Sequence, residues 1–158
     1  MIGVLYSTNR PHTDNIKSGR KLWEIRKSKP NIPVPFPAFI YETKKKGGCG
    51  KVIGEMIIAG SWEIPVNKIP KWCIKDGWVS EEFLKEYANG KEYLYANVIH
   101  MAHRYDKPKE ISEFYKCPRA QCDKCYGGIM NERLKKYGRC AECLRLTRPP
   151  QSRCYVEV

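Results

Sequence analysis

The stretch at residues 16–26, Ile-Lys-Ser-Gly-Arg-Lys-Leu-Trp-Glu-Ile-Arg, carries the pattern that decides how this chain is expected to fold. It reads as the end of a short helix, then Gly19 in the left-handed conformation that ends helices, then a β-prone strand. Alternation along a strand places Leu22, Glu24 and Arg26 on one face and Lys21, Trp23 and Ile25 on the other. A carboxylate and a guanidinium two residues apart can bind each other or a polar ligand. Alternatively, the charges only keep an exposed sheet edge soluble.

The charged residues of this stretch have the spacing Gly19-x-Lys21-x-x-Glu24-x-Arg26, and they follow a short strand and helix. This pattern resembles the signature of the ASCH domain, the activating signal cointegrator homology domain of the PUA-like superfamily. Further segments resemble strands of small bacterial and phage ASCH proteins in the same order: residues 39–44, 50–55, 95–99, 105–109, 148–152 and 154–156. The order of the motifs, more than any single one, makes the resemblance specific.

The resemblance implies an α+β fold: a PUA-like mixed β-barrel with short flanking helices. The barrel is expected at residues 1–114, completed by a closing strand at residues 153–158. Gly54 and Gly60 interrupt a long β-prone run at residues 51–64 and predict bulges that bend a strand round the barrel. Proline-rich residues 29–37 and irregular residues 65–78 are predicted loops, and Ser80 is expected to cap a helix at residues 81–88.

The cysteines point to a second, smaller unit. Cys122-x-x-Cys125 and Cys140-x-x-Cys143 are two chelating pairs at a spacing close to that of structural zinc knuckles. Four thiolates close the coordination shell, so the zinc would be structural and not catalytic. Cys117 could replace one ligand, and four unliganded thiols in a small core are the alternative. We therefore expect a zinc-knuckle or ribbon insertion at residues 115–150.

The net charge and the hydropathy of the sequence indicate which kinds of partner the protein can bind and where it is expected to be located. Lysine and arginine number 29 against 17 acidic residues, which gives a formal charge of +12 and favours a polyanion such as nucleic acid. The basic residues are scattered, so the charge alone does not separate this reading from simple solubility. The sequence has neither an apolar run long enough to span a membrane nor a signal-peptide pattern at its start, and a cytoplasmic protein is expected.

The ASCH resemblance also implies a ligand: RNA or a modified nucleoside, held in a cleft beside the signature turn. Some small bacterial members are amidohydrolases of acylated cytidine that use a lysine, a threonine and a glutamate, and ribonuclease activity is known for others. Lys21 matches the lysine, but Glu24 stands where the threonine nucleophile would be. The expected ligand-binding residues are Lys21, Glu24, Arg26, Tyr41, Thr43, Gln151 and Ser152.

Three functions follow from this reading. The first is a binding module for RNA, single-stranded nucleic acid or a nucleotide. The second is an enzyme, a nucleoside amidohydrolase or ribonuclease, in which Lys21 and Glu24 form a proton-transfer pair. The third is a phage-type protein-interaction adaptor that acts through the zinc module. Binding is preferred because it requires fewer coincidences of geometry than catalysis.

Overall fold

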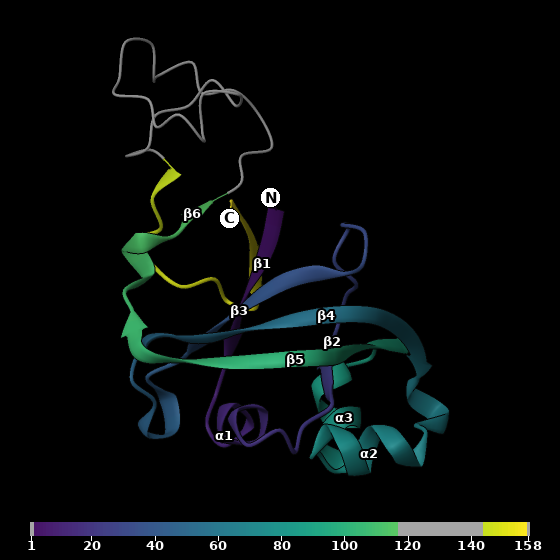
Figure 1. Cartoon of the computed structure of the whole chain (residues 1–158). Coiled ribbons are helices and arrows are strands. Elements are labelled where there is room, and N and C mark those ends of the chain that lie inside the picture. Colours follow the sequence, from purple (N-terminus) through teal and green to yellow (C-terminus); the bar gives the residue numbers. More distant parts are fainter. Residues whose placement is uncertain (1, 117–143, 158) are drawn as a thin grey trace.

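The computed structural model describes residues 2–116 and 144–157, and its frame is one mixed β-sheet with short helices on it (Figure 1). The strand order is β2-β5-β4-β3-β1-β7-β6. The strands are β1 (Ile2–Thr8), β2 (Trp23–Arg26), β3 (Phe36–Glu42), β4 (Lys51–Pro65), β5 (Tyr93–Lys109), β6 (Tyr115–Lys116) and β7 (Arg153–Glu157). The helices are α1 (His12–Lys17), α2 (Lys71–Gly77) and α3 (Glu81–Ala88), with 3-10 turns at Lys45–Gly47, Val66–Lys68 and Ile111–Glu113.

The parallel pair β1 and β3 lies in the interior of the sheet. Val4 pairs with Ala38 and Thr8 with Glu42, so both strands end at the same edge. A parallel pair needs a crossover connection, which α1 and β2 supply. The predicted loop at residues 29–37 is two residues too long, because β3 already starts at Phe36. Pro37 is tolerated because it lies outside the part of β3 that pairs with β1, where a proline would remove a ladder bond.

The long hairpin of β4 and β5 contains the bulges that were predicted at Gly54 and Gly60. Its register shifts beside Gly54 and again between Ile58 and Gly60, which confirms a bulge at each glycine. The sheet is nevertheless open, and the expected closed barrel is wrong. Within the described residues β2 pairs only with β5 and β6 only with β7, so the two edge strands do not meet. The strand at residues 153–157 therefore extends the sheet beside β1 and closes nothing.

Two helices cover the end of the sheet near β2. Helix α3 begins as expected, because the Ser80 hydroxyl accepts a hydrogen bond from the Phe83 amide at 3.1 Å. Helix α2 falls inside the region predicted to be an irregular loop, which corrects that prediction. It starts directly after Pro70 and ends at Trp78, and Cys73 at its centre is fully buried against α3 and the sheet.

The two faces of the sheet carry separate apolar clusters. One face buries Val4, Tyr6, Ile16, Phe36, Ala38, Ile40, Ile53, Met56 and Ile58 beneath α1. The opposite face buries Leu5, Phe39, Tyr41, Val52, Phe114 and Val156. Since β1 and β3 contribute alternate residues to the two clusters, every side chain of these strands is assigned to one face.

The ends of the expected insertion lie side by side. Tyr115 forms a β-bridge with Arg145, and the Leu146 amide donates to the Phe114 carbonyl at 2.9 Å. The predicted zinc ligands Cys122, Cys125, Cys140 and Cys143, and the substitute Cys117, lie outside the described residues. The described part of the chain, residues 2–116 and 144–157, has no group of metal-ligating side chains and no helix long and apolar enough to cross a membrane.

Candidate functional site

Lys21, Glu24 and Arg26 form a buried charged triad, which we call the signature triad. The Lys21 ammonium lies 2.9 Å from Glu24 Oε2, and Arg26 Nη2 lies 2.6 Å from Glu24 Oε1. All three residues are almost fully buried, at 5%, 3% and 7% exposure. The carboxylate and guanidinium share a strand face, as the alternation predicted. Lys21 reaches the same carboxylate because it precedes the strand, which starts at Trp23, and is free of its alternation.

Arg26 joins the triad to the end of β1. Its two terminal nitrogens each donate to the Ser7 carbonyl at 3.2 Å, and Nη2 also donates to Thr8 Oγ1 at 3.0 Å. The guanidinium carbon lies 4.5 Å from the centre of the Tyr6 ring, within the range of a cation–π contact. These contacts place the triad on the face of the sheet that packs beneath α1.

The electrostatics of the triad are unbalanced. Burial alone would raise the pKa of Glu24, but Lys21 and Arg26 outweigh it and hold that pKa at about 2. The carboxylate is therefore ionised at neutral pH, and one negative charge faces two positive ones. One unit of positive charge remains below the surface, offset in part by the Ser7 carbonyl. Charge in such a place is costly without an anionic partner.

Several buried polar atoms around the triad are unsatisfied hydrogen-bond donors or acceptors. Tyr6 Oη, Arg26 Nε, Asn97 Oδ1 and His12 Nδ1 are buried and have no hydrogen-bond partner among the described residues. Asn97 lies on β5 opposite Glu24, and its amide nitrogen donates to the Glu24 carbonyl at 2.8 Å. Buried polar groups in native proteins are nearly always paired, so such a group indicates a place for water or ligand.

His12, Tyr6 and Asn97 were not predicted as site residues. His12 begins α1, and its pKa is lowered by burial first and then by the charge of Lys21. It is therefore neutral near pH 7 and can both donate and accept a hydrogen bond. Of the three, only Asn97 could have been noticed in the sequence, because it is a polar residue in the middle of an apolar strand.

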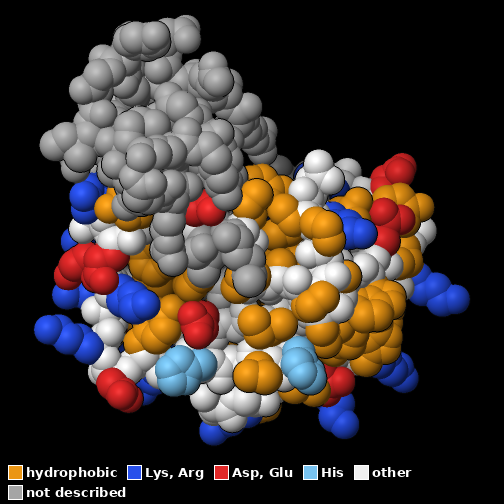
Figure 2. Space-filling model, turned by 45° about the horizontal axis from the view of Figure 1, so that its top comes forward, with side chains coloured by type: hydrophobic (Ala, Val, Ile, Leu, Met, Phe, Trp, Pro, Cys, Tyr) orange, Lys and Arg blue, Asp and Glu red, His pale blue; other side chains and the backbone are white. Residues whose placement is uncertain are grey.

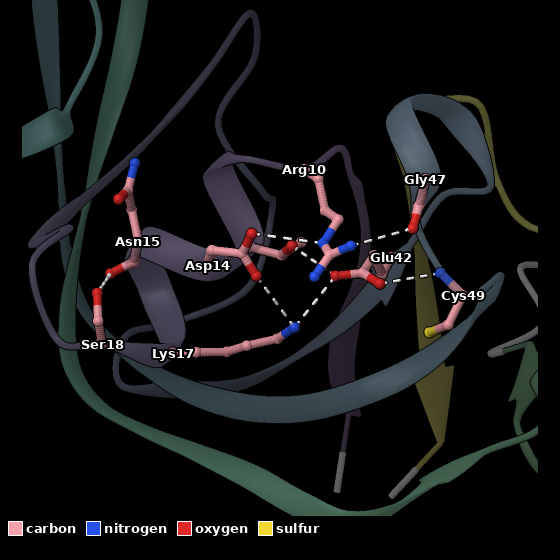
Figure 3. Close-up of polar contacts among 9 residues, drawn as sticks. Arg10, Asp14, Asn15, Lys17, Ser18, Glu42, Gly47 and Cys49 are labelled. Atoms are coloured by element: carbon pink, nitrogen blue, oxygen red, sulfur yellow. Dashed lines mark hydrogen bonds and ion pairs between the residues drawn. The ribbon is translucent and has the colours of Figure 1, made fainter.

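A second buried carboxylate, Glu42, fixes α1 to the end of β3 (Figure 3). The Thr13 hydroxyl donates to Glu42 Oε1 at 2.6 Å, the Lys17 ammonium lies 3.2 Å from the same oxygen, and the Cys49 amide donates to Oε2 at 2.9 Å. Burial opposes ionisation, but these bonds outweigh it and hold the pKa of Glu42 at about 2. Thr13 is fully buried, so this cluster is a structural joint that sets the position of α1.

The other expected ligand-binding residues divide between the two sides of the sheet. The Thr43 hydroxyl bonds the Asn9 side chain, and the Thr43 amide donates to the Thr8 carbonyl beside Arg26. Tyr41 packs on the opposite face with Leu5, so the sheet separates it from the signature triad.

The segment before β7 adjoins the triad through Ser7. The Ser7 amide donates to the Ser152 carbonyl at 2.9 Å, and its hydroxyl donates to the Pro150 carbonyl at 2.6 Å. Gln151 and Ser152 are themselves exposed. Next to them Arg153 donates to the carbonyls of Ser28 and Lys29 and so holds the chain that leaves β2.

Two hollows in the described part of the surface lie away from the signature turn, beside which the cleft was expected. The larger, of about 510 Å³, is lined by Pro65, Val66, Asn67, Lys85, Lys91, Glu92 and Tyr93. The smaller, of about 400 Å³, is lined by residues 29–33. Neither includes a member of the triad, which lies nearly closed in this conformation.

Solved structures share the fold, although no family model and no curated protein matches the chain. The crystal structure of ASCH from Zymomonas mobilis matches with a TM-score of 0.59 and 22% identity, over 69% of this chain and 73% of that one. A tyrosine-to-phenylalanine mutant of that protein gives 0.58 and 20%, over 69% and 76%. A serine-to-alanine mutant gives 0.65 and 17%, over 98% and 88%.

Identities this low establish a shared architecture and leave activity open. The superpositions and the mixed seven-stranded sheet agree with each other. The chain therefore has an ASCH-type fold.

Proposed function

We propose that this protein binds RNA or a nucleotide, with a phosphate or another anionic group accepted by Lys21 and Arg26 of the signature triad. The observation that carries the proposal is the unbalanced charge of the triad: two buried cations share one carboxylate. An anion would neutralise the remaining charge, and charge-assisted hydrogen bonds to a phosphate are among the stronger polar contacts.

Nucleic acid is the favoured source of that anion for two reasons. The net charge of +12 favours binding to a polyanion. The unpaired Tyr6 hydroxyl and Asn97 amide oxygen are a donor and an acceptor that suit the polar edges of a base or a ribose. Thr43 and Ser152 stand beside the same strand end and supply further hydroxyl groups.

Binding is preferred to catalysis because of the ionisation of Glu24. A general acid or base works best with a pKa near the working pH, and the pKa of Glu24 is held at about 2. Glu24 also replaces the threonine nucleophile of the amidohydrolase type. The nucleoside amidohydrolase and ribonuclease alternatives therefore require a rearranged triad. The adaptor alternative rests on the zinc module, whose predicted ligands lie outside the described residues.

The test compares Lys21→Met with Lys45→Met, a matched removal of an exposed lysine from the turn at Lys45–Gly47. The methionine keeps the aliphatic length and removes the ammonium. The probes are a short single-stranded oligouridine RNA and uridine monophosphate, measured by titration calorimetry. We expect Lys21→Met to weaken binding of both about ten- to hundred-fold, the range for a lost charged hydrogen bond. Lys45→Met should affect only the RNA, and only about two-fold.

Equal affinities of wild type and Lys21→Met for both probes would remove the triad from the binding site. Turnover of the RNA or of an acylated cytidine by the wild type, and its loss in Lys21→Met, would replace the binding proposal by the enzyme alternative.

A further inference from the structure

All four tryptophans of the chain gather around α2. Trp23 lies on β2, Trp62 near the end of β4, Trp72 on α2 and Trp78 at its end. The Trp23 ring centre lies 4.4 Å from that of Trp72 and 5.5 Å from that of Trp62. Three of the four are exposed: Trp62 at 51%, Trp72 at 37% and Trp78 at 47%. Tryptophan normally buries most of its large apolar area, so three exposed rings around one short helix call for a partner.

Trp62 lies flat on the sheet because of Gly60. A Cβ atom at Gly60 would approach the Trp62 ring to 2.4 Å, so any side chain there would push the ring away. Gly60 and Trp23 both pair with Val98 of β5, so the Trp62 ring, which lies over Gly60, reaches the row of the sheet that holds Trp23. Because Gly60 has no side chain, the Trp62 ring can pack over the backbone of β4 at this position.

Trp78 occupies a backbone conformation that rarely accommodates a bulky residue. It ends α2 with φ of 52°, in the left-handed region where glycine or asparagine is usual. The chain places glycine one position earlier, at Gly77. Such an outlier points to a role for the side chain itself.

Basic residues lie near these rings, together with the acidic residues Glu63 on β4 and Asp76 on α2. The Arg20 guanidinium lies 5.6 Å from the centre of the Trp78 ring. Lys71 and Lys75, one helical turn apart on α2, are exposed, as is Lys68 just before it. The acidic Glu63 nearby accepts a hydrogen bond from the Tyr95 hydroxyl at 3.1 Å. Figure 2 shows hydrophobic side chains on the right of the molecule, the side on which Figure 1 places the end of β4.

We propose that Trp62, Trp72 and Trp78 form a stacking surface for the unpaired bases of single-stranded nucleic acid, with Arg20, Lys71 and Lys75 beside its phosphates. Exposed aromatic faces interleaved with cations are the means by which single strands are held without sequence preference. A purely apolar protein partner would gain nothing from the surrounding lysines. The surface adjoins the signature triad, because Arg20 contacts Trp78 and the next residue, Lys21, contacts Glu24. In its choice of ligand the inference rests on the proposed function.

Intrinsic fluorescence tests the inference directly, because every tryptophan of the chain belongs to this region. The probes are an oligouridine RNA about ten nucleotides long, within the site sizes of single-strand binders, and an abasic ribose-phosphate strand of the same length. The abasic strand keeps the charge and lacks the bases. We expect the oligouridine to quench the fluorescence and to bind at least five-fold more tightly than the abasic strand.

Variants locate the effect. Trp62→Leu and Trp72→Leu should each lower oligouridine affinity at least five-fold and leave abasic binding unchanged. Gly60→Ala keeps every tryptophan but displaces the Trp62 ring, so it should reduce both quenching and affinity even if a leucine variant folds poorly. Met101→Ser, which removes an exposed apolar side chain elsewhere on β5, should do neither.

The outcomes separate this inference from the proposed function. Equal binding of both strands without quenching overturns the stacking surface and leaves phosphate binding at the triad standing. Base-dependent quenching that persists in Lys21→Met supports the stacking surface even if the triad fails its own test. Absence of binding to either strand overturns both. Self-association of the free protein that Trp62→Leu abolishes would make the surface a protein interface and overturn the inference.

Discussion

Replacement of Glu24 by glutamine is the most direct test of the charge arrangement at the signature turn. The change keeps the shape of the side chain and removes the negative charge between Lys21 and Arg26. Lowering the pKa of a carboxyl from 4.5 to about 2 corresponds to roughly 3 kcal/mol of stability in the ionised state. Removal of one partner from a buried ion pair costs a similar amount, about 3–5 kcal/mol. We therefore expect Glu24→Gln to lower the free energy of unfolding by about 3 kcal/mol at pH 7.

The assay is urea unfolding at several pH values between 7 and 3, with melting temperatures alongside. A loss of this size corresponds to about 6–12 °C for a chain of this length. A carboxyl with a depressed pKa contributes stability that is complete above pH 4.5 and is lost as the pH falls towards 2. Wild type should thus weaken steadily below pH 4.5, and Glu24→Gln should weaken less. Glu42, whose pKa is also about 2, titrates in the same window, so part of the slope should remain until Glu42→Gln is added.

The exposed Glu86 provides the control, because Glu86→Gln should change stability by less than about 0.5 kcal/mol. The reasoning is refuted if Glu24→Gln unfolds like the wild type at pH 7 and keeps its full acid slope. In that case the carboxylate is not held between two cations in solution.

Three further expectations can be checked with the same protein. The affinity for oligouridine RNA should fall linearly on a double-logarithmic plot against salt, because each neutralised phosphate of a single strand contributes about −0.7 to the slope; a flat plot across salt would exclude the electrostatic part of the proposal. Metal analysis of protein purified without added zinc should find about one zinc per chain, held by Cys122, Cys125, Cys140 and Cys143. The zinc should be lost when these cysteines are changed to serine, and fully reduced protein without zinc would contradict the knuckle prediction. Gly54→Ala should destabilise the fold by about 1–3 kcal/mol, since its Cβ would lie 2.3 Å from the His103 carbonyl oxygen and a backbone atom cannot move aside easily; urea unfolding that matches the wild type would show that the β4–β5 hairpin is looser than described.

Local signals in the sequence predicted most of the elements. The Ser80 cap, the bulges at Gly54 and Gly60 and the left-handed Gly19 are each set by a residue and its immediate neighbours, and all are present. Helix α2 escaped prediction because prolines precede it and Trp78 ends it in place of glycine. Closure of the sheet was also beyond local signals, since curvature of one strand does not determine whether two distant edges meet.

The same distinction explains the site. Alternation correctly joined Glu24 to Arg26, and the resemblance added Lys21. Tyr41 was predicted to bind the ligand, but it lies on the opposite face of the sheet from the triad. Its neighbour Ile40 pairs with Tyr6 and shares the face of the triad. Only the register of β1 against β3 shows which of the two residues faces the triad. Tyr6 and His12 lack any signal of their own in the sequence, because their polar atoms matter only after β1, α1 and β2 have been brought together.

The position of β1 in the sheet has a consequence for the order in which the molecule assembles. One side of β1 pairs with β3, where Val4 lies opposite Ala38, and the other pairs with β7, where Ile2 lies opposite Glu157. During synthesis the first partner, β3, becomes available early, and the second, β7, only once residues 153–157 have been made. Until then β1 presents a bare row of amides and carbonyls, which is a template for pairing with a neighbouring nascent chain. Pairing with residues 153–157 covers this edge of β1. A chain that is cut before Arg153 should therefore aggregate during folding.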